Sequence, residues 1–125
     1  MARKILIVDD EAHLRMLIQQ TLEDLEDEGV ELLTASVGEA ALEAIKAETP
    51  QLVFLDVMMP KLSGFDVCSR VKQTLGLKDV YIVLLTAKGQ EFDKQKGQDA
   101  GADLYMTKPF DPDALLEKAR TVLGL

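Results

Sequence analysis

Short apolar runs alternate with longer stretches of mixed character along the whole chain. The runs are rich in Val, Ile and Leu, and several are apolar at consecutive positions, as is typical of strands covered on both faces of a parallel sheet. They occupy residues 5–8, 30–35, 52–55, 80–85 and 104–106. The pattern therefore predicts five strands.

The stretches between these runs have the spacing of amphipathic helices. In the first, apolar residues recur every three or four positions, at Leu14, Leu17, Ile18, Leu22 and Leu25. The others are a second helix that stops before Pro50, a third after Gly64, a polar fourth at 91–100 that ends at Gly101, and a last one that begins at Asp111-Pro112. Strands that alternate with helices of this size favour an α/β fold, in which a doubly wound parallel sheet carries helices on both faces.

The pattern gives one domain over residues 1–125, with no repeat, linker or low-complexity tract. We expect no output domain within this chain. Three interpretations stay open: a stand-alone protein, a member of a relay, or part of a longer regulator.

Composition excludes several classes of function. The net charge of −8 and the pI near 4.6 argue against direct binding to nucleic acid or to an anionic membrane. No apolar run is long enough to span a bilayer, and no secretory signal precedes the first strand. The single cysteine, Cys68, cannot form an internal disulfide, which favours a cytoplasmic location. The acidic run at 23–28 is interpreted as the solvated end of the first helix.

Polar side chains stand at the carboxyl ends of four predicted strands. These residues are Asp9, Asp10, Asp56, Thr86 and Lys108. In parallel α/β sheets ligands bind beyond these strand ends, so we expect the five side chains to converge. Three carboxylates and one ammonium leave an excess of negative charge, and hard oxygen ligands of this kind suit Mg²⁺.

Other catalytic motifs are missing from the sequence. There is no nucleophile elbow around Ser63-Gly64, no phosphate-binding loop of the Gly-Lys-Ser/Thr type and no C-x-x-C pair. The lone His13 has no partner cluster, and Cys68 is interpreted as a small core residue.

The chain resembles the response-regulator receiver family of two-component signalling over essentially its whole length. The segments that carry the resemblance are ILIVDDE at 5–11, LDVMMP at 55–60 with Gly64, LTA at 85–87, GAD at 101–103 and KPF at 108–110. The resemblance implies the flavodoxin-like strand order 2-1-3-4-5.

The resemblance also implies a role for each polar residue. Asp56 matches the phosphorylated aspartate. Asp10, Asp56 and the backbone carbonyl of Met58 match ligands of Mg²⁺, or of Mn²⁺ in its place, with Asp9 acting mostly through a water. Thr86 and Lys108 match the hydroxyl and the ammonium that bind the phosphoryl group.

Four further positions follow from the same resemblance. Tyr105 matches an aromatic switch residue, and the Lys108–Pro109 bond matches a cis peptide. Ala87 matches a position that is kept small so that the phosphoryl donor can approach. Met58 and Lys88 occupy two variable positions that flank the phosphoryl group. Since Met58 cannot hydrogen-bond a water, we expect slow loss of phosphate.

The expected function is a phosphoacceptor switch rather than an enzyme that turns over an external substrate. A sensor histidine kinase or a histidine phosphotransfer protein would donate the phosphoryl group to Asp56. The surface formed by the fourth helix, the fifth strand and the fifth helix would then control a downstream protein. The polar fourth helix either forms an ion-paired homodimer face or is plain solvent surface, and the second interpretation is slightly favoured.

Two other functions fit the sequence less well. Phosphatases that form an aspartyl phosphate carry a second acid two residues after the first, whereas Met58 stands at that position. A degenerate receiver that only binds partners usually lacks one of the acid, hydroxyl or lysine positions, all of which are present here.

Overall fold

Five parallel strands form one sheet in the order β2-β1-β3-β4-β5, as the resemblance implied. The computed structural model describes residues 3–87, 93–108 and 110–125. The strands are β1 (Arg3–Val8), β2 (Val30–Ala35), β3 (Leu52–Asp56), β4 (Tyr81–Ala87) and β5 (Leu104–Lys108). The order reverses between β1 and β3, which therefore lie side by side at the topological switch point where such sheets bind ligands.

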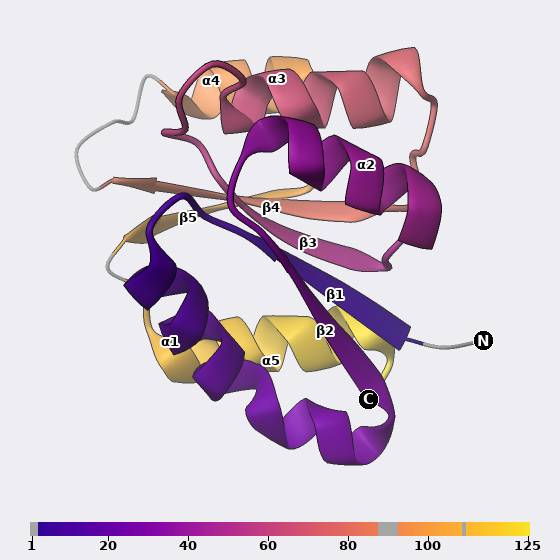
Figure 1. Ribbon diagram of the computed structural model, residues 1–125, viewed down its shortest axis with the longest axis vertical. Coiled ribbons are helices and arrows are strands. Elements are labelled where there is room, and N and C mark those ends of the chain that lie inside the picture. The colour runs from indigo at the N-terminus through magenta and orange to yellow at the C-terminus, as the bar shows by residue number, and fades with distance from the viewer. Residues whose placement is uncertain (1–2, 88–92, 109) are drawn as a thin grey trace.

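Helices cover both faces of the sheet (Figure 1). On one face lie α1 (Ala12–Leu22), the 3₁₀ segment η1 (Glu23–Glu28) and α5 (Pro112–Leu123). On the other face lie α2 (Gly38–Glu48), α3 (Gly64–Ser69), its π-helical continuation η2 (Arg70–Thr74) and α4 (Asp93–Ala100). The doubly wound α/β fold predicted from the sequence is confirmed.

The alternation of side chains along each strand produces two separate hydrophobic cores. In β3, Val53 and Leu55 pack toward α2 and α3, whereas Leu52 and Phe54 pack toward α1 and α5. All four side chains are fully buried. Strands covered on both faces need apolar residues at consecutive positions, which explains why the runs in the sequence do not alternate with polar residues.

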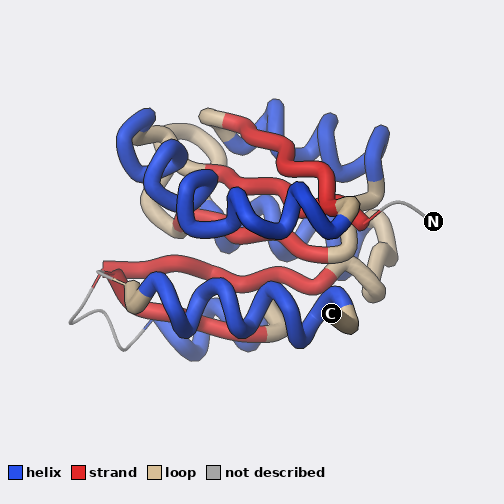
Figure 2. The backbone as a smooth tube through the Cα atoms, turned by 90° about the horizontal axis from the view of Figure 1, so that it is seen from below, coloured by secondary structure: helices blue, strands red, loops and turns tan. Residues whose placement is uncertain are grey.

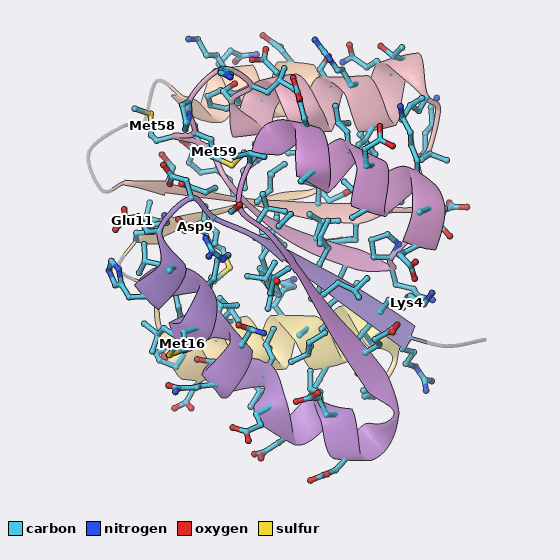
Figure 3. All side chains as sticks on the ribbon, viewed as in Figure 1. Lys4, Asp9, Glu11, Met16, Met58 and Met59 are labelled. Atoms are coloured by element: carbon cyan, nitrogen blue, oxygen red, sulfur yellow. The ribbon has the colours of Figure 1, made fainter. Side chains whose placement is uncertain are left out.

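The start of β1 and the C-terminus after α5 lie at the end of the sheet where the strands begin (Figure 2). The Arg3 side chain donates a hydrogen bond to the carbonyl of Leu123 there, at 2.9 Å. The opposite end, where the strands finish, carries Asp9, Glu11 and Met58, while Lys4 lies near the termini (Figure 3). The polar residues singled out in the sequence therefore gather at the end away from the termini.

The acidic run at 23–28 differs from the sequence expectation in its local structure. Helix α1 ends at Leu22, and the run forms η1, which Gly29 closes with a φ of 87°. Negative charges at the carboxyl end of an α-helix oppose the helix dipole, which disfavours continuation of α1 through the run. Within it Leu25 is buried, and Glu28 forms an ion pair with Arg120 at 2.8 Å.

Three side chains tie the carboxyl end of α4 to the segment formed by α3 and η2. Gln73 donates to the carbonyl of Asp99 at 2.6 Å, and the Cys68 thiol lies 3.6 Å from the carbonyl of Ala100. The buried Lys72 ammonium is 2.7 Å from the Asp103 carboxylate, which also accepts a hydrogen bond from the Ile82 amide. The loop between α4 and β5 is thereby fixed to the body of the domain.

Gly64 allows the start of α3 to approach the end of β3 closely. A Cβ at this position would lie 2.4 Å from the carbonyl oxygen of Asp56 and 2.9 Å from the Cα of Val57. Both neighbours are backbone atoms, so they cannot turn away as a flexible side chain could. The Gly64 amide also donates to the Val57 carbonyl at 3.0 Å, which holds the loop after Asp56 in place.

We predict that Gly64→Ala lowers the free energy of unfolding by about 1–3 kcal/mol, the usual cost of overpacking a tight contact. Because the clash falls on the Asp56 carbonyl, the NMR signals of Asp56 should shift as well. Urea denaturation and an amide correlation spectrum check both effects. Unchanged stability together with unchanged Asp56 signals would contradict the prediction.

Candidate functional site

Three carboxylates gather where β1 and β3 end. Asp9 and Asp10 follow β1, and Asp56 is the last residue of β3. Each offers one oxygen atom, and these three atoms lie within 4.8 Å of one another. Asp9 and Asp56 are buried, whereas Asp10 is exposed. The convergence predicted from the strand ends is therefore present for the three carboxylates.

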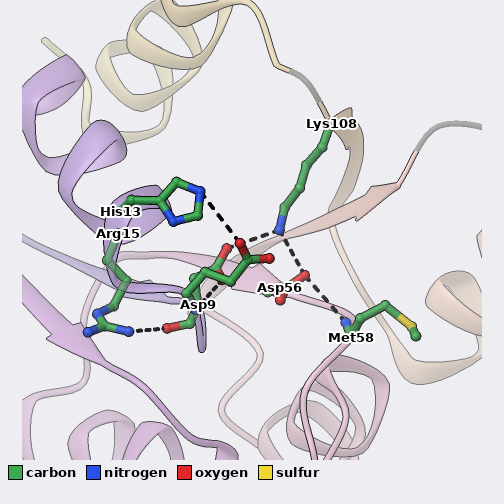
Figure 4. A network of polar contacts seen from close by, with 7 residues as sticks. Asp9, His13, Arg15, Asp56, Met58 and Lys108 are labelled. Atoms are coloured by element: carbon green, nitrogen blue, oxygen red, sulfur yellow. Dashed lines mark hydrogen bonds and ion pairs between the residues drawn. The ribbon is translucent and has the colours of Figure 1, made fainter.

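Lys108 lies between two of these carboxylates. Its ammonium is 3.0 Å from Asp9 Oδ2 and 3.1 Å from Asp56 Oδ1 (Figure 4). The register of the sheet places it there, because Lys108 ends β5 and pairs with Ala87, the last residue of β4. One ammonium opposes three carboxylates, so the site retains a net negative charge.

Backbone amides fix the orientation of the two buried carboxylates. The Glu11 amide donates to Asp9 Oδ1 at 2.9 Å, and the Met58 amide donates to Asp56 Oδ1 at 3.3 Å. Oδ1 of Asp56 thus accepts from both Met58 and Lys108.

The pKa of the Asp56 carboxyl is raised above its usual range. Burial is the main cause, and the nearby charge of Asp9 adds to it, while the hydrogen bond from Lys108 acts in the opposite direction. The pKa of Lys108 is also raised: burial favours its neutral form, but hydrogen bonds and attraction to Asp9 and Asp56 outweigh that effect. The ionised form of Asp56 is therefore disfavoured at this site, and a further cation would stabilise it.

Thr86 lies on β4, next to β3, and Tyr105 lies on β5, one strand further along the sheet. Thr86 is buried in β4 and pairs in register with Thr107 of β5. Tyr105 is half-buried, and its ring lies against Gly97 of α4, where an added Cβ would be 3.3 Å from the ring edge. The aromatic residue thus fills space between β5 and α4, as an aromatic packed on the last strand would.

Met58 and Met59 point in opposite directions at the loop after β3 (Figure 3). Met59 is buried, whereas Met58 is 62% exposed, beside the Asp56 carboxylate. The other predicted flanking residue, Lys88, lies outside the described residues, as does Pro109 with its predicted cis peptide. Ala87 ends β4, but its side chain is not among those described.

The residues that sequence reasoning set aside stay apart from this chemistry. His13 is exposed and contacts Glu11 at 3.5 Å rather than the three aspartates. Cys68 is fully buried, and burial raises the pKa of its thiol to about 12, so it is a core residue and not a nucleophile. None of the described helices combines the length and the hydropathy that a membrane crossing requires.

The model of the response regulator receiver domain matches residues 5–120. The chain belongs to this family. It is 45% identical over 123 residues to the alkaline phosphatase synthesis transcriptional regulatory protein PhoP of Bacillus subtilis, covering 98% of this chain and 49% of PhoP. It is 46% identical over 120 residues to the probable transcriptional regulator ycf27 of Pyropia yezoensis, covering 96% of this chain and 47% of that protein.

Solved receiver structures share the fold over the whole chain. A putative response regulator from Chloroflexus aurantiacus superposes with a TM-score of 0.86 at 33% identity, covering 100% of both chains. The receiver chain spans about half the length of the curated relatives that it matches.

The donor set of this receiver fits the divalent cation that its family binds at an acidic pocket. All the side-chain donors are carboxylate oxygens, which are hard ligands, and they surround a region with excess negative charge. Asp10 follows β1 and Asp56 ends the adjacent strand β3, and their carboxylate oxygens lie close enough for a single ion to contact both. The residues present therefore fit Mg²⁺.

One contact at the site was not predicted from the sequence. Arg15 donates to the backbone carbonyl of Asp9 at 2.7 Å. The sequence indicates only that Arg15 lies one helical turn after Glu11. A half-buried arginine at such a position of an amphipathic helix gives no specific indication of a bond to a strand end.

We predict that Asp56→Asn raises the free energy of unfolding when divalent cations are removed with EDTA. At neutral pH the ionised Asp56 destabilises the folded state, because its folded-state pKa lies above the unfolded value. The neutral amide removes that cost. As the pH falls through the raised pKa, wild-type Asp56 takes up a proton, and the advantage of the variant should shrink.

Urea denaturation at neutral and acidic pH measures this difference. The exposed Asp79→Asn serves as the matched control and should change stability by no more than about 0.5 kcal/mol. An Asp56→Asn protein that is less stable than wild type at neutral pH, or an advantage that grows toward acid, would show the prediction to be wrong.

Proposed function

We propose that this receiver accepts a phosphoryl group on Asp56 from a phosphohistidine of a sensor histidine kinase or histidine phosphotransfer protein. The observation that carries the proposal is the contact of one ammonium with two buried carboxylates, one of which has a raised pKa, at the switch point of the sheet. Residues 1–125 would act as one receiver unit in this role.

In the proposed reaction a carboxylate oxygen of Asp56 attacks phosphorus. The new bond joins that oxygen to phosphorus, and the phosphorus–nitrogen bond breaks, so the imidazole leaves with the bonding electron pair and takes up a proton. Lys108 bonds to Oδ1 of Asp56, and its positive charge offsets part of the repulsion between the carboxylate and the anionic phosphoryl group. Transfer yields an acyl phosphate on Asp56.

Lys108 would change partners during the transfer. Its ammonium contacts Asp56 Oδ1 before the reaction. Once phosphoryl oxygens lie beside it, they offer more negative charge than the esterified carboxyl, so Lys108 would bind one of them. Thr86 would donate its hydroxyl to another, as the resemblance implies.

Mg²⁺ when bound would supply positive charge that stabilises the phosphoryl oxygens in transfer. Asp10, Asp56 and the backbone carbonyl of Met58 would hold it, and Asp9 would contact it through a water. Mn²⁺ has the same preference for oxygen ligands and would serve in its place.

The downstream effect would pass through α4, β5 and α5. Movement of Thr86 toward the phosphoryl group would leave space on β4, and the Tyr105 ring on the next strand could turn inward to fill it. Because that ring packs against Gly97, its movement would change the surface between α4 and β5. A phosphoryl group would thereby shift the population of two states of this surface.

The partner at this surface would be a downstream protein or a second copy of the chain. We propose no direct contact with nucleic acid for this unit, since its net charge is −8. The names of the relatives identify them as transcriptional regulators. A longer regulator that contains this receiver would use another segment for any binding to DNA.

A small phosphodonor such as phosphoramidate tests the proposal directly. With Mg²⁺, intact-mass spectrometry should show one hydroxylamine-sensitive phosphoryl group on the wild type and on Asp79→Asn, and none on Asp56→Asn. EDTA should suppress the labelling. At ten times its Kd, Mg²⁺ should also stabilise the wild type by about 1.4 kcal/mol. Labelling of Asp56→Asn at the wild-type rate would refute the assignment.

Replacement of Met58 should change the lifetime of the acyl phosphate. The thioether cannot orient a water for attack on phosphorus, so Met58→Asn or Met58→Glu should speed loss of phosphate, by about tenfold for one good hydrogen bond. Release of inorganic phosphate after removal of the donor measures the rate. Met58→Leu, which is also apolar, should leave it close to wild type. Equal rates in all four proteins would rule out the role of Met58.

A further inference from the structure

Arg15 bonds to the strand end that carries the acid pair. It lies in the second turn of α1, is half-buried, and donates from Nη1 to the backbone carbonyl of Asp9 at 2.7 Å (Figure 4). Its amide also donates to the Glu11 carbonyl at 3.1 Å, in the first turn of the helix. The same residue therefore connects α1 both to its own start and to the end of β1.

The target of this guanidinium is unexpected on electrostatic grounds. The chain has an excess of acids, and three carboxylates lie close by. Within the described part of the chain, however, Arg15 makes no ion pair, and its hydrogen bond goes to a neutral peptide oxygen. A group placed for charge pairing would bind a carboxylate, so the geometry indicates control of the backbone.

The carbonyl of Asp9 belongs to the peptide unit that joins Asp9 to Asp10. This unit is planar, so a bond to its oxygen fixes the direction of the Asp10 amide and Cα as well. Asp10 is exposed and stands on the loop between β1 and α1. The Arg15 bond is thus a restraint on where the exposed carboxylate is placed.

The remaining polar atoms of Asp9 are held by other elements. Its amide donates to the Ala35 carbonyl of β2 at 3.2 Å, Oδ1 accepts from the Glu11 amide, and Oδ2 accepts from Lys108. Arg15 engages the one backbone oxygen that these contacts leave. The amide, the carboxylate and the carbonyl of Asp9 are consequently all held by hydrogen bonds, and these bonds also restrain the peptide that leads to Asp10.

We propose that Arg15 is a positioning residue for the divalent cation, acting through the Asp9–Asp10 peptide. This proposal rests on the proposed function, because it assumes that Mg²⁺ binds at the acid group. Without the Arg15 bond the peptide can rotate, and Asp10 must be ordered each time the ion binds. The loss of that order weakens binding of the ion.

Removal of Arg15 has two effects on the affinity for Mg²⁺, and they have opposite signs, so the measured change distinguishes between them. A cation close to the acid group repels Mg²⁺, so loss of its charge alone would tighten binding. Loss of positioning would weaken binding, as loss of groups that orient metal ligands does by about 10–100-fold. We expect Arg15→Ala to weaken Mg²⁺ binding by about tenfold despite the favourable change in charge.

Isothermal titration of the metal-free protein with Mg²⁺ alone measures this change, with circular dichroism to confirm folding. Arg3→Ala is the matched control, since it also removes one positive charge and one arginine-to-carbonyl bond, to Leu123 at the far end of the sheet. Its Mg²⁺ affinity should equal that of the wild type. Arg15→Lys retains a cationic donor and should recover affinity to within about threefold of the wild type.

The outcomes separate this inference from the function on which it rests. If the wild type binds Mg²⁺ and Arg15→Ala binds it equally well or more tightly, the positioning role is overturned but the proposed function is not. An Arg15→Lys protein as weak as Arg15→Ala also overturns it. Wild type that takes up no Mg²⁺ overturns the proposed function and this inference together. If Arg15→Ala does not fold, Arg15→Gln, which keeps a donor of shorter reach, takes its place with the same expected loss.

Discussion

The contact of Lys108 with Asp9 and Asp56 makes this arrangement of buried acids sustainable. Burial of an unpaired carboxylate is expensive, and two of them side by side repel as well. The Lys108 ammonium, 3.0 Å from Asp9 and 3.1 Å from Asp56, offsets part of that cost. The site still carries more negative than positive charge. The rest of the fold serves to bring the ends of β1, β3 and β5 to one level, so that this contact can form.

The location of the site follows from simple features of the sequence. Apolar runs with no alternation predict strands covered on both faces, and the residue after each run then lies at the same edge of the sheet. This reasoning correctly brings Asp9, Asp10, Asp56 and Lys108 together. It needs no knowledge of side-chain rotamers, because the direction of parallel strands alone determines which ends meet.

Individual contacts could not be predicted in the same way. The bond from Arg15 to a carbonyl and the ion pair between Lys72 and Asp103 depend on the tilt of helices against the sheet. No periodicity in the sequence encodes that tilt. The boundary at Leu22 was also missed, since the apolar position at Leu25 has helical spacing although its backbone is 3₁₀.

The attachment of α4 to α3 and η2 has a mechanical consequence. Gln73, Cys68 and Lys72 all hold the same end of this helix and the loop beyond it. Reorientation of α4 on the sheet therefore has to preserve these three contacts or break them, so the carboxyl end of the helix resists displacement.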